Sequence, residues 1–332
     1  MSSTESFSFT LTALRLRFHC AVKTPIHFGG LRAGSNLRGA LVNVMRRAAC
    51  PEAPLLVGEA EEVRSAHLAV CPVCWLVAAN DHPGQERRGY VITPPLAIGE
   101  SLEPGAAFDF HLTLFGEALR YLPYFVLAVP EAGRTGLGAG RGRFALKSIH
   151  AEHPLYEDWI VLKQGENVVH PPADSITHAD IQQAAEALAI RLGTSPARLR
   201  LDFLTPLRII LDERLLKSPD FGAIFNHILR RADELAVQYC GGVERPLAER
   251  QRLWELAKRV SMVESQTRWA EVSSGSNRTG QPTWISGLVG SACYSAPLEV
   301  WRELLTWLLW GEIVQVGKDT TKGNGVYRLN VD

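Results

Sequence analysis

Residues 9–22 read FTLTALRLRFHCAV, and apolar and polar side chains alternate strictly over the middle of this stretch. Successive side chains of a β-strand point to opposite faces. Two sets would therefore face opposite ways: the apolar Leu14, Leu16, Phe18 and Cys20, and the polar Arg15, Arg17 and His19. The pattern predicts a half-buried strand with a basic outer face.

The elements that follow this strand predict the rest of a small sheet. They are a helix at 37–48 that Asn36 would cap, an irregular insertion rich in proline and cysteine at about 49–90, a strand at 106–116, a helix at 118–129 with Pro123 in its first turns, and a strand at 144–149. Strands and helices in this order, with antiparallel hairpins, are typical of a ferredoxin-like α+β sheet.

The second half of the chain repeats this order. It is predicted to contain a short helix at 180–192, a strand at 198–210, helices at 221–240 and 249–263, a strand at 287–294, a helix from Pro297 to Gly311, and a final hairpin built from 314–329. The repetition predicts tandem ferredoxin-like (RRM-like) domains. We assign 1–150 to the first domain, 151–197 to a surface connection, and 198–332 to the second domain.

The composition is that of a globular protein. The chain has 332 residues, of which 46% are hydrophobic and 21% are charged, and this length suits two domains. No run of about 18 apolar residues predicts a membrane span, and the start, MSSTESFSF, lacks the features of a signal peptide. We expect a cytoplasmic protein. Six cysteines in so long a chain do not indicate a disulfide scaffold.

The charge is balanced overall but uneven along the chain. There are 35 basic and 35 acidic side chains, which argues mildly against nucleic-acid binding. Residues 1–50, however, hold seven Lys or Arg against the single acid Glu5, and 133–147 hold four basic residues and no acid. Because salt screens charges beyond about 10 Å, such local basic regions can still bind phosphate.

Two glycine-rich loops carry basic residues, GRTGLGAGRGR at 133–143 and VQVGKDTTKGNGVYRL at 314–329. Glycine allows positive φ and lets backbone amides approach a phosphate closely, although glycines also serve simply as turns. Neither loop has the ending of a phosphate-binding P-loop. The partial G-x-G-x-x-G match at 136–142 lacks a strand–loop–helix context, so we do not expect dinucleotide binding.

Several motifs together resemble those of the CRISPR-associated endoribonucleases of the RAMP superfamily, which process precursor CRISPR RNA. They are SNLRGAL at 35–41, LTLFG at 112–116, LPYF at 122–125, GLGAGRGRF at 136–144, FLTPL at 203–207, Trp269 followed by Ser276-Asn-Arg278, GLVG at 287–290, and GKDTTKGNGVY at 317–327. The last motif is the most specific, and the set spans nearly the whole chain.

This resemblance implies two ferredoxin-like domains with RNA held across the cleft between them. Phosphates would lie on Lys318 and Lys322, with Gly323 and Gly325 giving close access. Further RNA contacts would come from Arg15, Arg17, Arg32, Arg141, Arg143, Lys147 and Arg278. The implied partners are CRISPR repeat RNA or crRNA and, in addition, other subunits of a CRISPR ribonucleoprotein complex.

The resemblance also implies cleavage without a metal ion, in which the ribose 2′-OH attacks the adjacent phosphate and leaves a 2′,3′-cyclic phosphate. Such enzymes commonly take a histidine from the region of the first helix, but 37–48 contains none. We therefore assign proton transfer to His27, with His19 as the weaker candidate, and stabilisation of the phosphate to Arg38, assisted by Arg32.

Two alternatives to an RNA-cutting enzyme remain open. The missing helix histidine favours a noncatalytic subunit that holds crRNA in an effector complex. An unrelated binding protein whose glycines merely form turns is the other possibility, and salt-dependent RNA binding would distinguish it from the first two.

The cysteines between the first helix and the second strand have the spacing of metal ligands. Cys71-Pro-Val-Cys74 is a C-x-x-C pair, and Cys50 lies 21 residues before it. With His67 or His82 as a fourth ligand, these thiolates would form a structural zinc site, whereas no cofactor is expected for catalysis. The alternative is three buried thiols without a metal.

Overall fold

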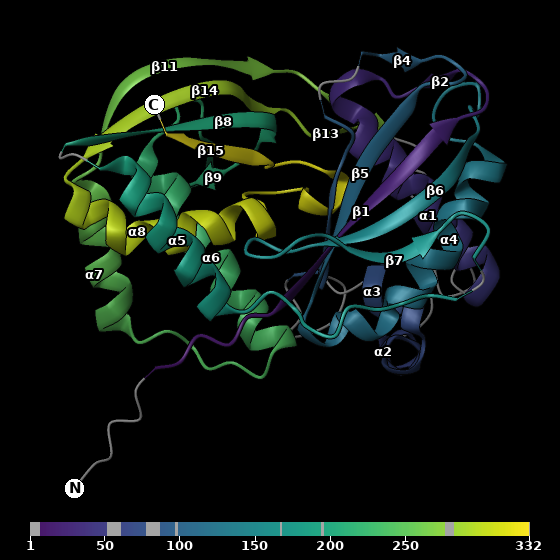
Figure 1. The fold of residues 1–332 in the computed structure, drawn as a ribbon, viewed down its shortest axis with the longest axis horizontal. Coiled ribbons are helices and arrows are strands. Elements are labelled where there is room, and N and C mark those ends of the chain that lie inside the picture. The colour runs from purple at the N-terminus through teal and green to yellow at the C-terminus, as the bar shows by residue number, and fades with distance from the viewer. Residues whose placement is uncertain are drawn as a thin grey trace, which may run out of the picture.

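The computed structural model describes residues 7–51, 61–77, 87–96, 99–166, 168–193, 196–275 and 282–331. These residues form two α+β halves that lie side by side (Figure 1). Each half has one antiparallel sheet with helices packed against it. The predicted α+β class with tandem ferredoxin-like sheets is confirmed.

The N-terminal sheet has the strand order β3-β5-β1-β6-β7, and every neighbouring pair is antiparallel. Its strands are β1 (Ala13–Val22), β3 (Tyr90–Thr93), β5 (Ala107–Phe115), β6 (Phe144–Glu152) and β7 (Trp159–Lys163). The helices of this half are α1 (Ala33–Ala49), α2 (Glu61–Val70), α3 (Pro72–Val77) and α4 (Leu122–Thr135). A two-residue pair, β2 (Ile26–His27) and β4 (Ser101–Leu102), lies beside the sheet.

The alternation in β1 is confirmed. Leu16, Phe18 and Cys20 are fully buried, whereas the intervening polar residues are only partly so. Phe18 faces Phe110 of β5 in the register, and the two rings stack with their centroids 4.8 Å apart. The apolar side of β1 therefore forms the centre of the N-terminal core.

Two predictions for this half are wrong in detail. The insertion at 49–90 is not simply irregular, because it contains α2 and α3, and Val73, Leu76 and Val77 of α3 are buried in the core. Asn36 does not cap α1, which begins at Ala33 because the short 3-10 helix η1 (Gly30–Arg32) leads directly into it. Pro123 does lie in the first turn of α4, after the 3-10 helix η3 (Gly116–Tyr121).

The C-terminal sheet has the order β11-β14-β8-β15, which matches the arrangement of the first half. Its strands are β8 (Ala197–Leu207), β11 (Ser261–Ala270), β14 (Gly287–Ala296) and β15 (Tyr327–Val331). The helices are α5 (His178–Leu192), α6 (Phe221–Tyr239), α7 (Leu247–Lys258) and α8 (Leu298–Val314), all below the sheet in Figure 1. Two small hairpins pair β9 (Ile210–Leu211) with β10 (Arg214–Leu215), and β12 (Ser273–Gly275) with β13 (Pro282–Trp284).

The predicted elements near the C-terminus need correction. The helix expected to reach residue 263 ends at Lys258, and 261–270 form β11. Helix α8 continues past Gly311 to Val314, so VQV is not a strand and the last segment is not a hairpin. Instead, a loop containing the 3-10 helix η4 (Thr320–Lys322) leads to the single strand β15, which pairs with β8.

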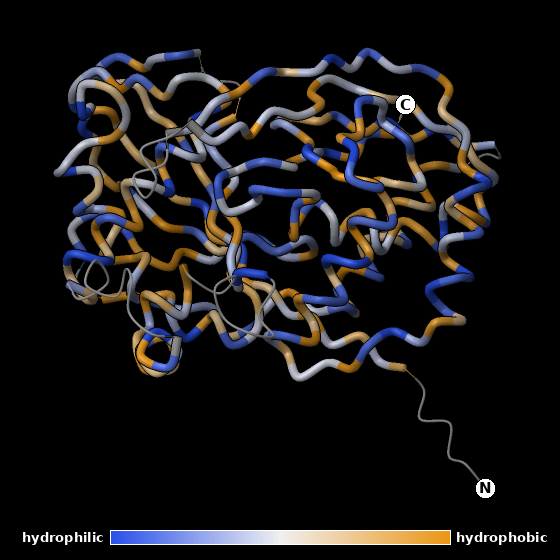
Figure 2. Tube along the Cα trace, turned by 180° about the vertical axis from the view of Figure 1, so that it is seen from behind, coloured by the Kyte–Doolittle hydropathy of each residue, from blue (hydrophilic) through white to orange (hydrophobic). Residues whose placement is uncertain are grey.

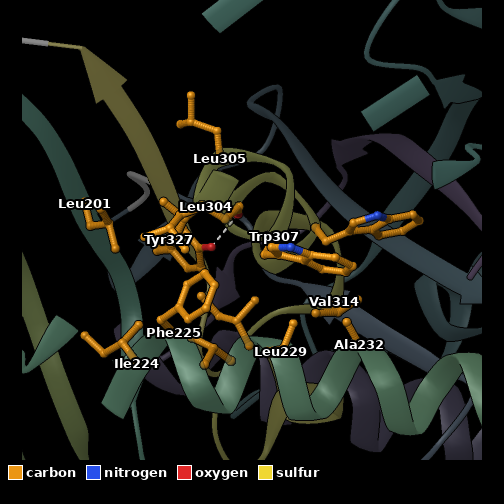
Figure 3. Packing of buried hydrophobic residues seen from close by; sticks show 14 of the residues in the cluster. Leu201, Ile224, Phe225, Leu229, Ala232, Leu304, Leu305, Trp307, Val314 and Tyr327 are labelled. Carbon is orange, nitrogen blue, oxygen red and sulfur yellow. Dashed lines mark hydrogen bonds between the residues drawn. The ribbon is translucent and has the colours of Figure 1, made fainter. Parts of the chain in front are cut away.

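Gly311 is required by packing and does not end α8. A Cβ at this position would lie 2.1 Å from the hydroxyl oxygen of Tyr327. That hydroxyl donates a hydrogen bond to the Leu308 carbonyl at 2.5 Å, shown as the dashed line in Figure 3. The same core contains Phe225, Leu304 and Trp307 (Figure 3), so α6, α8 and β15 are held together around the Tyr327 ring.

Segments outside the two sheets connect the halves. The chain before β1 runs along the helices of the C-terminal half (Figure 1), where Phe9 packs edge-on against Trp307 with centroids 4.9 Å apart. The expected connection, 151–197, contains β7, which extends the N-terminal sheet, and α5, which packs against α8. It is therefore more than a surface link.

Polar residues lie on the outer elements of the fold, as expected for a globular protein. Helix α7 at the outer edge of the C-terminal half is mainly hydrophilic in Figure 2. Among the described residues, no helix is both long and apolar enough to cross a membrane.

The packing at Gly311 generates a stability prediction. We expect Gly311→Ala to lower the free energy of unfolding by about 1–3 kcal/mol, because the added methyl group overpacks the core against Tyr327. Gly39→Ala in α1 is the matched control, since a Cβ there meets nothing within 4 Å. It should raise stability by about 0.5–1 kcal/mol. Urea unfolding followed by circular dichroism measures both, and equal effects of the two changes would contradict the packing role of Gly311.

Candidate nucleic-acid interface

The first turn of α1 lies between the two glycine-rich loops. A Cβ on Gly34 would lie 2.2 Å from the Lys322 carbonyl oxygen, so the C-terminal loop rests on the helix backbone. On the other loop, a Cβ on Gly138 would lie 2.2 Å from the His27 carbonyl oxygen and 4.0 Å from Nδ2 of Asn36. Two loops that are about 180 positions apart in the chain thus meet at one helical turn.

Next to this turn, His27 presents an exposed side chain at the end of β2. Its backbone forms a β-bridge with Ala139, and a Cβ on Gly140 would lie 3.8 Å from the His27 Cδ2. Arg141 follows in the same loop, is exposed, and has a positive φ of 50°. An accessible imidazole is therefore set against a glycine-rich loop that carries a cation.

Two arginines of the predicted site lie at the start of α1. Arg32 is exposed and turns back over the preceding glycines, since a Cβ on Gly29 would lie 3.2 Å from the Arg32 Nε. Arg38 lies further along the helix and is half-buried. Its Nε is buried without a hydrogen-bond partner among the described residues. The fold thus gathers His27, Arg32 and Arg141 around one turn, with Arg38 on the helix that follows.

His19 lies elsewhere, in a network on the outer face of the N-terminal sheet. Its Nδ1 is 2.6 Å from Asp109 Oδ1 on β5. Arg15 and Arg17 both pair with Glu152, at 3.0 Å and 3.1 Å, and Arg17 also pairs with Asp158. These acids come from distant positions in the chain and neutralise most of the basic face that the sequence of β1 predicts.

Glu152 is the centre of this network. Burial raises the pKa of Glu152, but the hydrogen bond from His111 and the positive charges of His111 and Arg15 outweigh it and lower that pKa to about 2. The carboxylate therefore stays ionised, and Arg15 and Arg17 remain paired with it at neutral pH.

The C-terminal glycine-rich loop is largely buried at the junction of the two halves. A Cβ on Gly323 would lie 2.9 Å from Pro94. A Cβ on Gly325 would collide with the Val316 carbonyl oxygen. Lys322 forms an ion pair with Asp319 at 2.9 Å. Both glycines have positive φ and are packed against other parts of the protein. These contacts account for glycine at both positions, and the sequence alone does not reveal them.

Buried amides fix this loop to its surroundings. Gln315 is fully buried, and its Nε2 donates to the Ile92 carbonyl and to the Thr93 hydroxyl of β3, both at 3.0 Å. Asn324, also buried, donates to the Ile285 carbonyl at 2.8 Å. The hydrogen bonds of Gln315 cross from one half to the other, so the loop acts as a structural joint.

Lys318 is the exposed cation of this loop, and it borders a pocket of about 190 Å³. The charged and titratable side chains that line the pocket are all basic or histidine: Arg87, Arg208, Arg230, Arg231, Lys318 and His227. Glu234 pairs with two of them, Arg87 at 2.5 Å and Arg230 at 2.8 Å. An excess of positive charge remains at the pocket, which we call the arginine pocket.

Arg231 is the buried member of the arginine pocket. It is 5% exposed, and its Nε donates to the Val314 carbonyl at 2.7 Å. Burial, together with the charge of Arg87, lowers the pKa of Arg231 to about 9. Sequence reasoning missed this residue, although one signal was available: Arg231 falls between Ile228 and Leu235 on the apolar stripe of α6.

A second basic groove, of about 440 Å³, lies between the end of α4 and strands β6 and β7. Its basic residues are Lys23, Arg134, Arg143, Lys147 and Lys163. Arg134 is paired with Glu131, and Lys147 donates to Gln164 Oε1 at 2.9 Å. The fold therefore brings the predicted Arg143 and Lys147 together and adds Lys23 and Lys163. Arg278 and the rest of Ser276–Arg278 lie outside the described residues.

The predicted metal ligands converge in the N-terminal half. Cys50, His67, Cys71 and Cys74 each offer a ligand atom, and all four atoms lie within 4.8 Å of one another. His82, the other histidine considered from the sequence, lies outside the described residues.

Known proteins share this fold and part of its sequence. An uncharacterized protein of Archaeoglobus fulgidus is 25% identical over 333 residues, covering 98% of this chain and 99% of the relative. Thermus thermophilus Cas6 superposes with a TM-score of 0.56 at 14% identity, covering 97% of this chain and all of that chain. A structure described as a partial Cas6-RT-Cas1–Cas2 complex gives a TM-score of 0.63 at 13% identity, over 99% of this chain and 47% of that one.

Family models match both halves. Residues 11–174 match a family described as an N-terminal domain, and 201–327 match the family described as CRISPR-associated endoribonuclease Cas6. The Cas6 match covers β8 to the start of β15, including the buried C-terminal loop. At such low identities the solved structures establish only the fold. The match to a family model adds sequence similarity to Cas6 over 201–327. Residues 201–327 therefore resemble the CRISPR-associated endoribonuclease Cas6 family, and the fold of the chain is that of the solved Cas6 structures.

Proposed function

We propose that this protein cuts the repeat of a CRISPR RNA without a metal ion and keeps the product bound. The 2′-oxygen of a ribose forms a bond to the adjacent phosphorus while the bond from phosphorus to the 5′-oxygen breaks. One proton leaves the 2′-OH and another is delivered to the 5′-oxygen, which yields a 2′,3′-cyclic phosphate and a 5′-OH. The observation that carries the proposal is the exposed His27 beside the arginine-bearing turn between the two glycine-rich loops.

The side chains at this turn fit the roles that the reaction needs. Histidine can accept or donate a proton near neutral pH, so His27 would transfer one of the two protons. Arg32 would stabilise the extra negative charge that develops on the phosphate oxygens, because a guanidinium donates several hydrogen bonds to phosphate. Arg38, which is half-buried on α1, would assist Arg32 in this role.

His19 is the weaker candidate for proton transfer. It is partly buried and is held by Asp109, within the network that also includes Arg17. A histidine fixed in this way can support the sheet without touching RNA. Its role in cleavage is tested together with that of His27.

RNA phosphates would lie along cations that outnumber the acids beside them. In the arginine pocket Glu234 pairs with Arg87 and Arg230, and further cations, including Lys318, remain. The basic groove has five basic residues and one lining acid, Glu166. A buried positive charge such as Arg231 is costly unless an anion accompanies it, and phosphate is the anion that RNA supplies. The C-terminal loop reaches from this pocket, at Lys318, to the first turn of α1.

The alternative function is that of a noncatalytic subunit that holds crRNA. One observation favours it: the residues of α1 include no histidine. The similarity to a chain from a partial Cas6-RT-Cas1–Cas2 complex is compatible with either function within a larger CRISPR assembly. Both functions require RNA binding, and only the first requires cutting.

Cleavage of the cognate repeat RNA in excess EDTA is the experiment that tests the proposal. We expect wild type to cut and to leave a cyclic phosphate, and His27→Ala to cut about 10²-fold or more slowly, because proton transfer is lost. His170→Ala, at an exposed histidine of the segment that follows β7, is the matched control and should cut like wild type.

The other outcomes separate the alternatives. Full activity in His27→Ala together with loss in His19→Ala would move the proton transfer to the sheet network. If wild type binds the repeat tightly but leaves it intact with and without divalent ions, the protein is a crRNA-holding subunit. Cutting that EDTA abolishes would refute metal independence.

The arginine pocket makes a separate prediction about binding. Arg208→Ala combined with Lys318→Ala should weaken repeat binding and reduce the slope of log K against log salt by about 1.4, or about 0.7 for each phosphate of a single strand that the protein no longer neutralises. The matched control is Arg252→Ala, which removes a cation paired with Glu249 and Glu303 on the outer helices. An unchanged slope in the double variant would exclude the pocket from the RNA path.

A further inference from the structure

We propose that Cys50, His67, Cys71 and Cys74 bind one structural zinc ion that holds α2 and α3 against the end of α1. The four ligand atoms lie within 4.8 Å of one another, and all three cysteines are buried. In a tetrahedral site with Zn–S bonds of about 2.3 Å, the sulfur atoms lie about 3.8 Å apart. The Cys50 and Cys74 sulfurs are 3.4 Å apart, so these two need to separate by only a few tenths of an ångström.

The ligands come from two separate stretches that the backbone brings together. Cys50 directly follows α1, and its amide donates to the Arg46 carbonyl at 2.8 Å. Cys71 joins α2 to α3, and its amide donates to the His67 carbonyl at 2.9 Å. Cys74 lies within α3, one turn after Cys71. The C-x-x-C pair and the histidine are thereby set on a single helical hairpin that faces the end of α1.

The imidazole distinguishes this cluster from a group of buried thiols. The Nε2 of His67 lies 3.2 Å from the Cys50 sulfur, pointing at the thiols. An apolar core gains little from placing a histidine nitrogen against three sulfurs, whereas a Cys₃His set is a common ligand set of structural zinc. Three thiolates and one imidazole in a tetrahedral arrangement favour zinc over hard cations, which prefer oxygen ligands.

The position of the cluster says what the ion would stabilise. Trp75 follows Cys74 directly and packs against Tyr121 at 4.9 Å and Tyr239 of α6 at 5.5 Å, measured between ring centroids. Arg120 lies over the same indole at 5.1 Å. A zinc ion at Cys74 would therefore anchor α3 and, through Trp75, the contact between the two halves.

Metal analysis of the purified full-length protein tests this inference, and it does not depend on RNA cleavage. We expect about one zinc ion per chain in wild type and below about 0.1 in Cys71→Ser/Cys74→Ser. The control variant is Cys293→Ala, which removes a buried thiol from β14 and should keep the zinc. Replacing zinc with cobalt should give the thiolate charge-transfer and tetrahedral d–d absorption bands in wild type and in Cys293→Ala.

A milder variant keeps the test decisive if the double variant does not fold. His67→Ala retains the three thiols, and we expect a chelator to remove its metal at a concentration about tenfold or more below that needed for wild type. Chelation should also lower the Tm of wild type. Wild type that has reduced thiols but binds neither zinc nor cobalt would overturn the proposal, as would a disulfide between Cys50 and Cys74 found in its place by mass spectrometry.

Discussion

The close contact between Gly34 and the Lys322 carbonyl determines much of the rest of this structure. No other residue fits at position 34, because a Cβ there would lie 2.2 Å from the carbonyl oxygen. The contact sets the first turn of α1 directly on the C-terminal loop, and Gln315 adds hydrogen bonds from that loop to β3. His27 and Arg32 precede this turn, so the geometry of the proposed reaction site depends on a joint formed by the other half.

Where positive charge remains on this protein depends on ion pairs formed by folding as much as on the positions of Lys and Arg in the sequence. The outer face of β1 is basic when its sequence is considered alone, but Glu152, Asp109 and Asp158 neutralise it across the sheet. The arginine pocket shows the reverse, because Arg208 and Arg231 come from separate elements and meet beside Lys318. The surfaces proposed to contact RNA are therefore set by where the fold places more cations than acids.

Local patterns predicted most of the fold, and distant contacts account for the errors. The alternation in 13–22 predicted β1, and the repeated order of elements predicted both sheets. The final hairpin was wrong because Val314 and Val316 look like strand residues, yet both are buried at the end of α8 and in the joint. The spacing of the cysteines predicted their convergence but not which histidine joins them, since that depends on how α2 folds back.

The site was harder to predict than the fold for a related reason. The glycines of the C-terminal loop have the pattern of an exposed phosphate cradle, but their neighbours Val316 and Pro94 are supplied by folding. Arg231 was missed because its surroundings depend on a pocket formed by four segments of the chain. Sequence patterns describe one element at a time, whereas a binding site depends on which elements meet.

The chain exchanges segments between its two halves at both ends. The segment before β1 lies on the C-terminal helices, where Phe9 contacts Trp307, while the loop before β15 lies against α1 and β3. Leu11, Val91 and Phe115 belong to the same continuous core as Phe225 and Trp301. The C-terminal core therefore includes side chains of the N-terminal half, whereas residues between 14 and 161 form a separate core within that half. A polypeptide cut between the two sheets would leave the C-terminal fragment with a core that lacks Leu11, Val91 and Phe115.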